Sequence, residues 1–217
     1  VPFLSTIIAV TLKVLLFISV IGMVGVEATS FIAIIGAAGL AIGLSLQGTL
    51  QNFAGGVVLL LLRPFKKGDV IDAKGYLGVV HETQMFYTII NTFDNKVVYV
   101  PNGPLANSDM TNLSQKEDRR NEWKFGIGYG DDVAKAKEIL RRLIDEDERI
   151  FKDPEPFLAL HSLGDSSVNI VVRTWSKASD LWPVFFDMNE KVYNEFAKEG
   201  INIPFPQMDV HLHKQNG

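Results

Sequence analysis

The stretch GAAGLAIGLSLQG, residues 36–48, decides the fold class of this chain. Four of its thirteen residues are glycine and three are alanine, yet it lies inside a long apolar run in which a helix is expected. A glycine in a helix interior costs roughly 1 kcal/mol relative to alanine. So many glycines in so short a span indicate that the helix gains something from them, and close packing is the gain that small residues allow.

The apolar run belongs to a chain whose charge is unevenly distributed. Residues 1–62 contain only two charged residues, Lys13 and Glu27, whereas the sequence from Arg63 onward is normally charged and carries the net charge of −4. Residues 3–26 are apolar enough, and longer than the roughly 20 residues needed, to cross a bilayer as a helix. We therefore predict a membrane protein with a transmembrane helix in residues 1–27.

The second apolar segment is longer than one perpendicular crossing requires. Within residues 28–63 we predict a pore-lining helix followed by an interfacial helix. The bend is expected at Gly48, because the spacing of apolar residues becomes that of an amphipathic helix after it. The basic residues Arg63, Lys66 and Lys67 follow this segment and place that end in the cytoplasm.

On a helical wheel, residues 31–46 separate into distinct faces. Glycines form one small face, alanines with Ser45 form a second, and two leucines fall between them, while bulky side chains occupy the far side. The glycine face is Gly36, Gly39 and Gly43; the alanine face is Ala33, Ala37 and Ala41; the leucines are Leu40 and Leu44; the bulky residues are Phe31, Ile35, Ile42 and Leu46.

Two small faces on one helix indicate two close helix neighbours, since small residues let backbones approach in a bilayer. A ring with head-to-tail contacts supplies both neighbours and turns Leu40 and Leu44 toward its axis, as a hydrophobic constriction. The polar residues Gln47, Gln51 and Asn52 fit the mouth of such a pore. The alternative is an ordinary glycine-rich helix pair, although that would need only one small face.

Several segments resemble the small-conductance mechanosensitive channel (MscS) family of bacteria. They are GAAGLAIGLSLQGTLQNFAGGVVLLLLRPFKKGD, VVYVPNGPLANSDMTNLS, RRNEWKFGIGYGDD, LGDSSVNIVVRTW and PFPQMDVHLH. The resemblance covers nearly the whole chain in the family's order. It implies a homoheptamer in the bacterial inner membrane with cytoplasmic C-terminal domains, which opens under membrane tension and releases ions and small solutes on hypoosmotic shock.

The same resemblance assigns roles to particular residues. Leu40 and Leu44 match the family's pore constriction, the glycine and alanine faces match its helix-packing faces, and Gly48 matches its bend. Ser45 stands where the family commonly has alanine. The family usually has one more N-terminal span, which we expect upstream of Val1.

The remainder of the chain is predicted to form soluble domains. Residues 64–115 contain short strands at 70–71, 78–82, 86–92 and 96–100, with a hairpin at Asp94-Asn95. They predict a small β-barrel or strongly bent sheet, and the resemblance implies a barrel of the Sm type. Residues 116–206 read as strand 121–128, helix 131–145, strands 157–163 and 167–175, helix 181–199 and strand 202–205, the ferredoxin-like α+β order. Residues 207–217 hold a last short strand, which copies in a ring would pair.

No cofactor, metal or catalytic site is predicted. The chain has no cysteine, and His211 and His213 with Asp209 are better explained as solvated side chains than as metal ligands. The acidic run at 145–149 is interpreted as a solvated helix end. Nucleic acid is not expected as a partner of this acidic chain. The alternative function is a membrane-anchored ligand-binding or sensor module with a ferredoxin-like domain.

Overall fold

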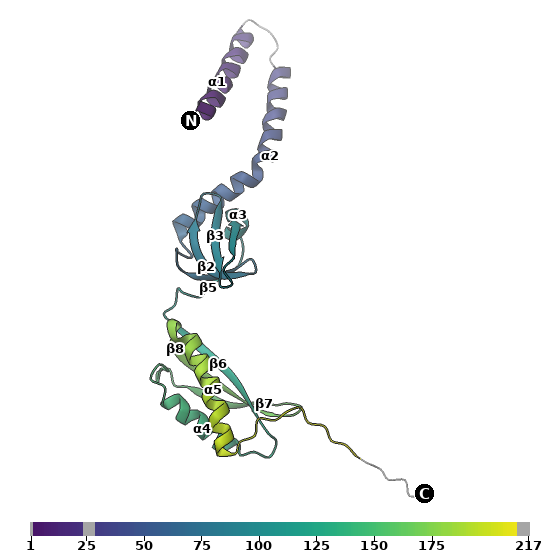
Figure 1. The fold of residues 1–217 in the computed structure, drawn as a ribbon. Coiled ribbons are helices and arrows are strands. Elements are labelled where there is room, and N and C mark those ends of the chain that lie inside the picture. The colour runs from purple at the N-terminus through teal and green to yellow at the C-terminus, as the bar shows by residue number, and fades with distance from the viewer. Residues whose placement is uncertain (1, 24–28, 212–217) are drawn as a thin grey trace, which may run out of the picture. The chain divides into compact units, whose positions relative to one another are not determined.

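The structure is a computed structural model that describes residues 2–23 and 29–211. The chain divides into two compact units, Val1–Leu113 and Ser114–Gly217, which we call unit 1 and unit 2. Figure 1 shows the order of their helices and strands along the chain.

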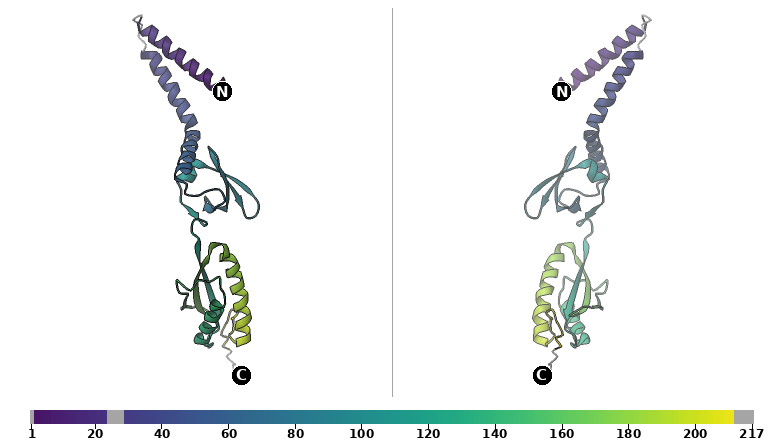
Figure 2. Two further views of the ribbon diagram at one scale, coloured as in Figure 1. Left: turned by 90° about the vertical axis from the view of Figure 1, so that its left-hand side faces the viewer. Right: turned by 90° about the vertical axis from the view of Figure 1, so that its right-hand side faces the viewer.

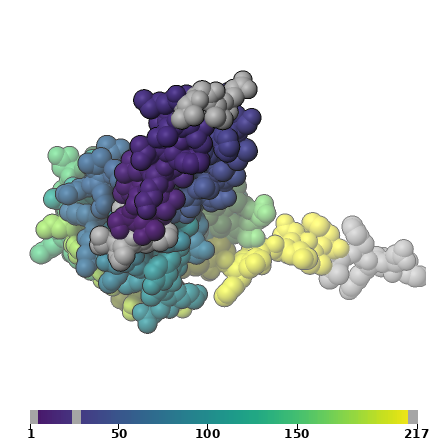
Figure 3. Space-filling view, turned by 90° about the horizontal axis from the view of Figure 1, so that it is seen from above, coloured from purple at the N-terminus to yellow at the C-terminus, as the bar shows by residue number. Residues whose placement is uncertain are grey.

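Unit 1 begins with two apolar helices, α1 (Pro2–Met23) and α2 (Thr29–Leu62). At 1.5 Å per residue their lengths are about 33 and 51 Å, against roughly 30 Å for a hydrocarbon core. Both are long and apolar enough to cross a membrane. Almost all described side chains of α1 are exposed. In the view from above, other parts of the chain do not cover the side of α1 that faces the viewer (Figure 3). The helical hydrogen bonding of α2 is unbroken, and its axis changes direction along its second half (Figure 1).

The rest of unit 1 is one antiparallel sheet with a short helix. Its elements are β1 (Val70–Ala73), β2 (Tyr76–Thr83), β3 (Tyr87–Thr92), β4 (Val97–Pro101), α3 (Asn102–Ala106) and β5 (Met110–Asn112). The strand order is β4-β3-β2-β1-β5, so β4 and β5 are the edges and the described pairing is that of a bent sheet. The predicted hairpin at Asp94-Asn95 is confirmed, with Asn95 in the left-handed region at φ 63°.

The core of this sheet also holds the end of α2. Ile71, Val80 and Ile90 from the strands are buried together with Leu59 of α2 and with Phe65, which follows it. The end of α2 is therefore built into the hydrophobic core of the β domain.

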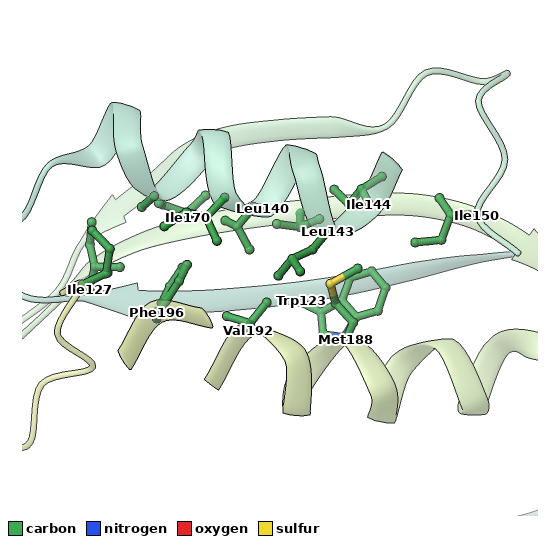
Figure 4. Packing of buried hydrophobic residues seen from close by; sticks show 14 of the residues in the cluster. Trp123, Ile127, Leu140, Leu143, Ile144, Ile150, Ile170, Met188, Val192 and Phe196 are labelled. Carbon is green, nitrogen blue, oxygen red and sulfur yellow. The ribbon is translucent and has the colours of Figure 1, made fainter. Parts of the chain in front are cut away.

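Unit 2 is an antiparallel sheet covered on one face by two helices. Its elements are β6 (Asp118–Ile127), α4 (Val133–Asp145), β7 (Phe157–Leu163), β8 (Val168–Lys177), a short 3-10 turn η1 (Ala178–Asp180) and α5 (Leu181–Glu199). The strand order is β6-β8-β7. Figure 2 shows both helices beside the sheet, and Figure 4 shows their apolar side chains meeting in one core around Leu140, Ile170 and Phe196. The side chain of Asp132 caps α4, and Gly200 ends α5 in the left-handed region.

The predicted strand at 202–205 is wrong. Residues 202–205 pair with no strand in the described part of the chain, and β6, the strand nearest to them, ends at Ile127. The N–H of Gly128 donates to the carbonyl of Asn202, while the N–H of Asn202 donates to the Asp131 carboxylate. Pro204 has no N–H to continue a ladder. Residues 207–211 likewise form no strand within the chain, and 212–217 lie outside the described residues, so a strand paired between copies stays a prediction.

The interpretation of residues 145–149 as a solvated helix end holds for Asp145, Glu146 and Glu148, which are exposed, and is wrong for Asp147, which is buried. Arg149 donates from Nε and Nη2 to its two carboxylate oxygens at 2.8 and 2.7 Å, and Lys191 of α5 lies at 3.4 Å. The hydrogen bonds from Arg149 lower the pKa of Asp147 to about 2, against the opposing effect of burial. Arg149 also pairs with Asp187, so the cluster ties the loop after α4 to α5.

Candidate functional site

The first half of α2 carries the predicted pore residues, and no other described part of the chain packs against their side chains. An ideal Cβ added at Gly36, Gly39 or Gly43 would meet no described atom within 4 Å. Leu40 and Leu44 are 65% and 63% exposed. The alanine-face residues are exposed as well, namely Ala33, Ala37 and Ala41. Both small faces of α2 are thus open among the described residues.

Ser45, on the alanine face, satisfies its hydroxyl inside the helix. Its Oγ donates to the carbonyl of Ala41 at 2.8 Å, so it presents no free donor to a neighbouring helix. It therefore acts as a small residue, as the alanines beside it do.

In the second half of α2, by contrast, other atoms of the same chain occupy the space beside the glycines. A Cβ at Gly55 would lie 2.5 Å from the carbonyl oxygen of Asn102, and one at Gly56 would lie 2.3 Å from that of Met85. Both glycines are buried. Only glycine permits this approach, which presses α2 against α3 and the β2–β3 connection.

Asn102, at the start of α3, is the polar centre of this junction and is fully buried. Its Oδ1 accepts from the Thr88 hydroxyl at 2.8 Å, and its Nδ2 donates to the carbonyl of Gln84 at 2.8 Å. Its backbone N–H donates to the carbonyl of Phe86 at 2.9 Å. Three segments of unit 1 are thereby fixed at the surface on which α2 rests.

Asn52 completes the junction from the side of α2. Its Oδ1 accepts from the backbone N–H of Gly103 at 3.0 Å, and it is half-buried. Gln47 and Gln51 are exposed. The three polar residues predicted at the pore mouth therefore differ. Asn52 binds the β domain, and the Cγ of Gln51 lies so close to Gly103 that a Cβ added there would meet it at 2.9 Å.

This junction was missed by reasoning from sequence. Its local signals were the adjacent glycines Gly55 and Gly56 in an otherwise leucine-rich helix and the Pro-Asn-Gly run at 101–103. Neither signal identifies its partner, because Asn52 and Gly103 are 51 residues apart.

A basic turn follows the last turn of α2. Arg63, in the left-handed region at φ 47°, is exposed, as are Lys66 and Lys67. The turn is held by Asp69, which is buried and accepts from the backbone N–H of Lys66 and from the Asn112 side chain. The backbone of this turn thus holds three basic side chains at the end of the apolar helix.

Two protein-family models match the chain. One is described as the mechanosensitive ion channel beta-domain and matches residues 48–115; the other is described as the MscS C-terminal region and matches residues 121–203. The chain belongs to the MscS family of mechanosensitive ion channels. The first match begins at Gly48 and so includes the second half of α2 with the sheet, in agreement with the docking at Gly55 and Gly56.

Relatives across the MscS family support this membership. An uncharacterised MscS family protein of Buchnera aphidicola is 43% identical over 98% of this chain and 70% of its own length. A small-conductance mechanosensitive channel of Edwardsiella ictaluri is 43% identical over 82% of this chain and 62% of its own length. The crystal structure of Helicobacter pylori MscS in a closed state matches with a TM-score of 0.90 and 32% identity, covering 99% of this chain and 85% of that one.

The predicted fold class is confirmed, with apolar N-terminal helices, a β domain and a C-terminal α+β domain. Membership in the family supports a mechanosensitive channel over the alternative of a membrane-anchored ligand-binding or sensor module. The Gly48 bend and the roles of the individual pore residues stay predictions.

Proposed function

We propose that this protein is a tension-gated channel whose pore is a ring of α2 helices, assembled as a homoheptamer in the bacterial inner membrane. Its cytoplasmic end is the basic turn after α2. On hypoosmotic shock the ring opens and passes ions and small solutes. The surrounding lipids transmit the tension.

The observation that carries the proposal is the contrast between the two sets of glycines in α2. Backbone atoms of the same chain occupy the space where a Cβ on Gly55 or Gly56 would stand. A Cβ on Gly36, Gly39 or Gly43 would meet no described atom within 4 Å. Every helical glycine costs roughly 1 kcal/mol relative to alanine. The open set therefore needs a partner outside this chain, and the separate alanine face supplies one on the next copy.

In such a ring each glycine face receives the alanine face of a neighbour, and the contact repeats head to tail until it closes. Leu40 and Leu44 lie between the two faces and so point to the axis. Rings of leucine exclude water from a narrow pore, so the closed state does not conduct. Tension favours the open state because it occupies more membrane area. A shift from 1:99 to 99:1 needs a differential energy of about 5.5 kcal/mol.

Leu44→Ser tests the pore assignment, with Leu46→Ser as its control. Both are exposed leucines of α2, but Leu46 lies on the bulky face that turns away from the predicted axis. Serine at position 44 adds a ring of hydroxyls to the constriction, so we expect it to hold water, leak at rest and impair growth on expression. Serine at position 46 leaves the constriction unchanged and should grow and gate as the parent does.

Growth on expression and patch-clamp currents at zero applied tension read out both variants. Equal resting currents and equal growth for the two variants would contradict the assignment of Leu44 to the constriction.

A further inference from the structure

The first apolar helix carries one charged residue, Lys13, inside its candidate membrane span. The span is Ser5–Met23, with a mean hydropathy of 2.3. At 1.5 Å per residue, Lys13 lies about 12 Å along the helix from Ser5, close to the middle of a hydrocarbon core roughly 30 Å thick. An ionisable side chain at this depth is costly unless it has a partner, so its presence indicates a site.

The apolar helices supply no partner for this ammonium group. The only carboxylate in residues 1–62 is Glu27, which comes after the last residue of α1, Met23. Met23 is already about 15 Å from Lys13 along the helix. Side chains in a helix lean toward its N-terminus, so Lys13 points away from that end. Every copy of the chain has the same sequence, and the countercharge must therefore come from something other than α1 and α2.

The face of α1 on the N-terminal side of Lys13 has room for another group. Ala9 and Thr6 lie four and seven residues before Lys13, on the same face of the helix. Both are small and exposed, whereas Phe17, one turn after Lys13, is large. The space beside Lys13 is thus open toward the start of α1. In the proposed orientation α2 ends in the cytoplasm, so α1 begins on that side and the open space faces the cytoplasmic leaflet.

We propose that Lys13 binds the headgroup of an anionic phospholipid of the cytoplasmic leaflet, held over Thr6 and Ala9. The extended lysine stem covers about 6 Å of the distance to Ser5 and keeps its charged end toward the membrane surface. Local thinning of the bilayer brings a lipid phosphate the rest of the way inward. The ammonium group then has its countercharge without any carboxylate of the protein.

The charge of the ligand decides its class. In phosphatidylcholine the choline cation already balances the phosphate, whereas phosphatidylglycerol keeps a net negative charge that the lysine attracts. A free phosphate ion has the same chemistry, but it would lose its hydration at this depth. A lipid carries its phosphate to the site on acyl chains that belong in the hydrocarbon.

This inference rests on the proposed function for the orientation of α1, and the leucine constriction plays no part in it. It names the class of lipid that contacts the helix on which membrane tension acts. The lipid site and the channel can therefore fail separately.

Tryptophan reporters on α1 measure which lipid lies beside Lys13. Phe17→Trp places an indole on the Lys13 face, and Leu15→Trp places one at nearly the same depth but about 200° around the helix. Both positions are more than half exposed. We would reconstitute the full chain in vesicles of phosphatidylcholine and phosphatidylglycerol, with brominated acyl chains on one lipid at a time to quench a tryptophan in contact. The signal of the three native tryptophans, all in unit 2, is recorded without a reporter and subtracted.

Each reporter is combined with Lys13, with Lys13→Arg and with Lys13→Met, which keeps an unbranched stem and removes the charge. Beside Phe17→Trp we expect phosphatidylglycerol to be favoured about five-fold over phosphatidylcholine, which corresponds to about 1 kcal/mol for one lysine. Lys13→Arg should retain this preference and Lys13→Met should lose it. Leu15→Trp should show no preference in any of the three backgrounds.

The same preference in Lys13→Met as in the parent would overturn the lipid site. So would its loss on addition of inorganic phosphate, because that result would assign the lysine to a free anion. Equal quenching by the two brominated lipids beside Lys13 removes the lipid site and leaves the proposed function standing. A Phe17→Trp reporter that neither lipid quenches overturns both, since α1 would then lie outside the bilayer.

Discussion

Replacing Gly56 with alanine tests how tightly α2 is docked on the β domain. The new Cβ would lie 2.3 Å from the Met85 carbonyl oxygen and 2.8 Å from Nδ2 of Asn102, whereas ordinary contacts begin at 3.4 Å. The Met85 backbone must therefore retreat by about 1 Å within a packed junction. Such overpacking typically costs 1–3 kcal/mol, and alanine returns up to about 1 kcal/mol through its helix propensity. We expect a net loss of about 1–2 kcal/mol in the stability of unit 1.

Gly48→Ala is the matched control, because it makes the same change in the same helix where a Cβ would meet no described atom within 4 Å. It should stabilise the helix by about 1 kcal/mol or less. Calorimetry in one detergent measures both variants, since all three tryptophans lie in unit 2 and fluorescence would not follow unit 1. A loss of 1 kcal/mol lowers the melting temperature by roughly 2–8 °C for domains of this size range. If Gly56→Ala melts at or above the temperature of Gly48→Ala, the docking argument fails.

Other perturbations test the remaining parts of the structure. Gly43→Leu fills the open glycine face, so it should raise the tension threshold measured by patch clamp or break up the complex; an unchanged threshold with an intact oligomer contradicts the packing role. Asn102→Leu leaves the Gln84 carbonyl and the Thr88 hydroxyl without their partner, at a cost of about 1–3 kcal/mol for each group. The calorimetric transition of unit 1 should fall, and an unchanged transition would show that the junction tolerates the loss. Asp147→Asn removes a carboxylate whose folded pKa, about 2, lies below the ordinary 3.8. That carboxylate stabilises unit 2 by about 2 kcal/mol above pH 4, and the contribution is lost as the pH falls toward 2. The variant should therefore unfold more easily at neutral pH and show a flatter pH dependence between 4 and 2, followed by tryptophan fluorescence; parallel pH profiles for variant and parent would contradict this.

Features set by local physics were predictable from the sequence. The two apolar helices follow from uninterrupted hydrophobicity, and the Asp94-Asn95 hairpin follows from the tolerance of asparagine for the left-handed region. The ends of α4 and α5 follow from a capping aspartate and from Gly200. Each of these depends on a few neighbouring residues, so no tertiary information was needed.

Features set by distant partners were not predictable in this way. Asp147 is paired chiefly with Arg149, which is two residues away, but the cluster that encloses it also includes Lys191, which is 44 residues away on another helix. The local sequence shows the first partner and does not show the second. The missing strand at 202–205 had a local signal in Pro204 and Pro206, but its alternating apolar residues outweighed that signal. Its hydrogen bonds go to the β6–α4 turn, which only the folded chain brings near.

Some glycines of α2 are explained by contacts within one chain, and others are not. Gly55 and Gly56 look like Gly36, Gly39 and Gly43 in the sequence, and all are helical. The first two are explained by backbone that fills the space a side chain would take. The other three would together weaken the helix by about 3 kcal/mol relative to alanine, and no contact among the described residues offsets that loss. A contact made once with each neighbour in a closed ring is repeated in every copy, so it can offset that loss at every subunit at once.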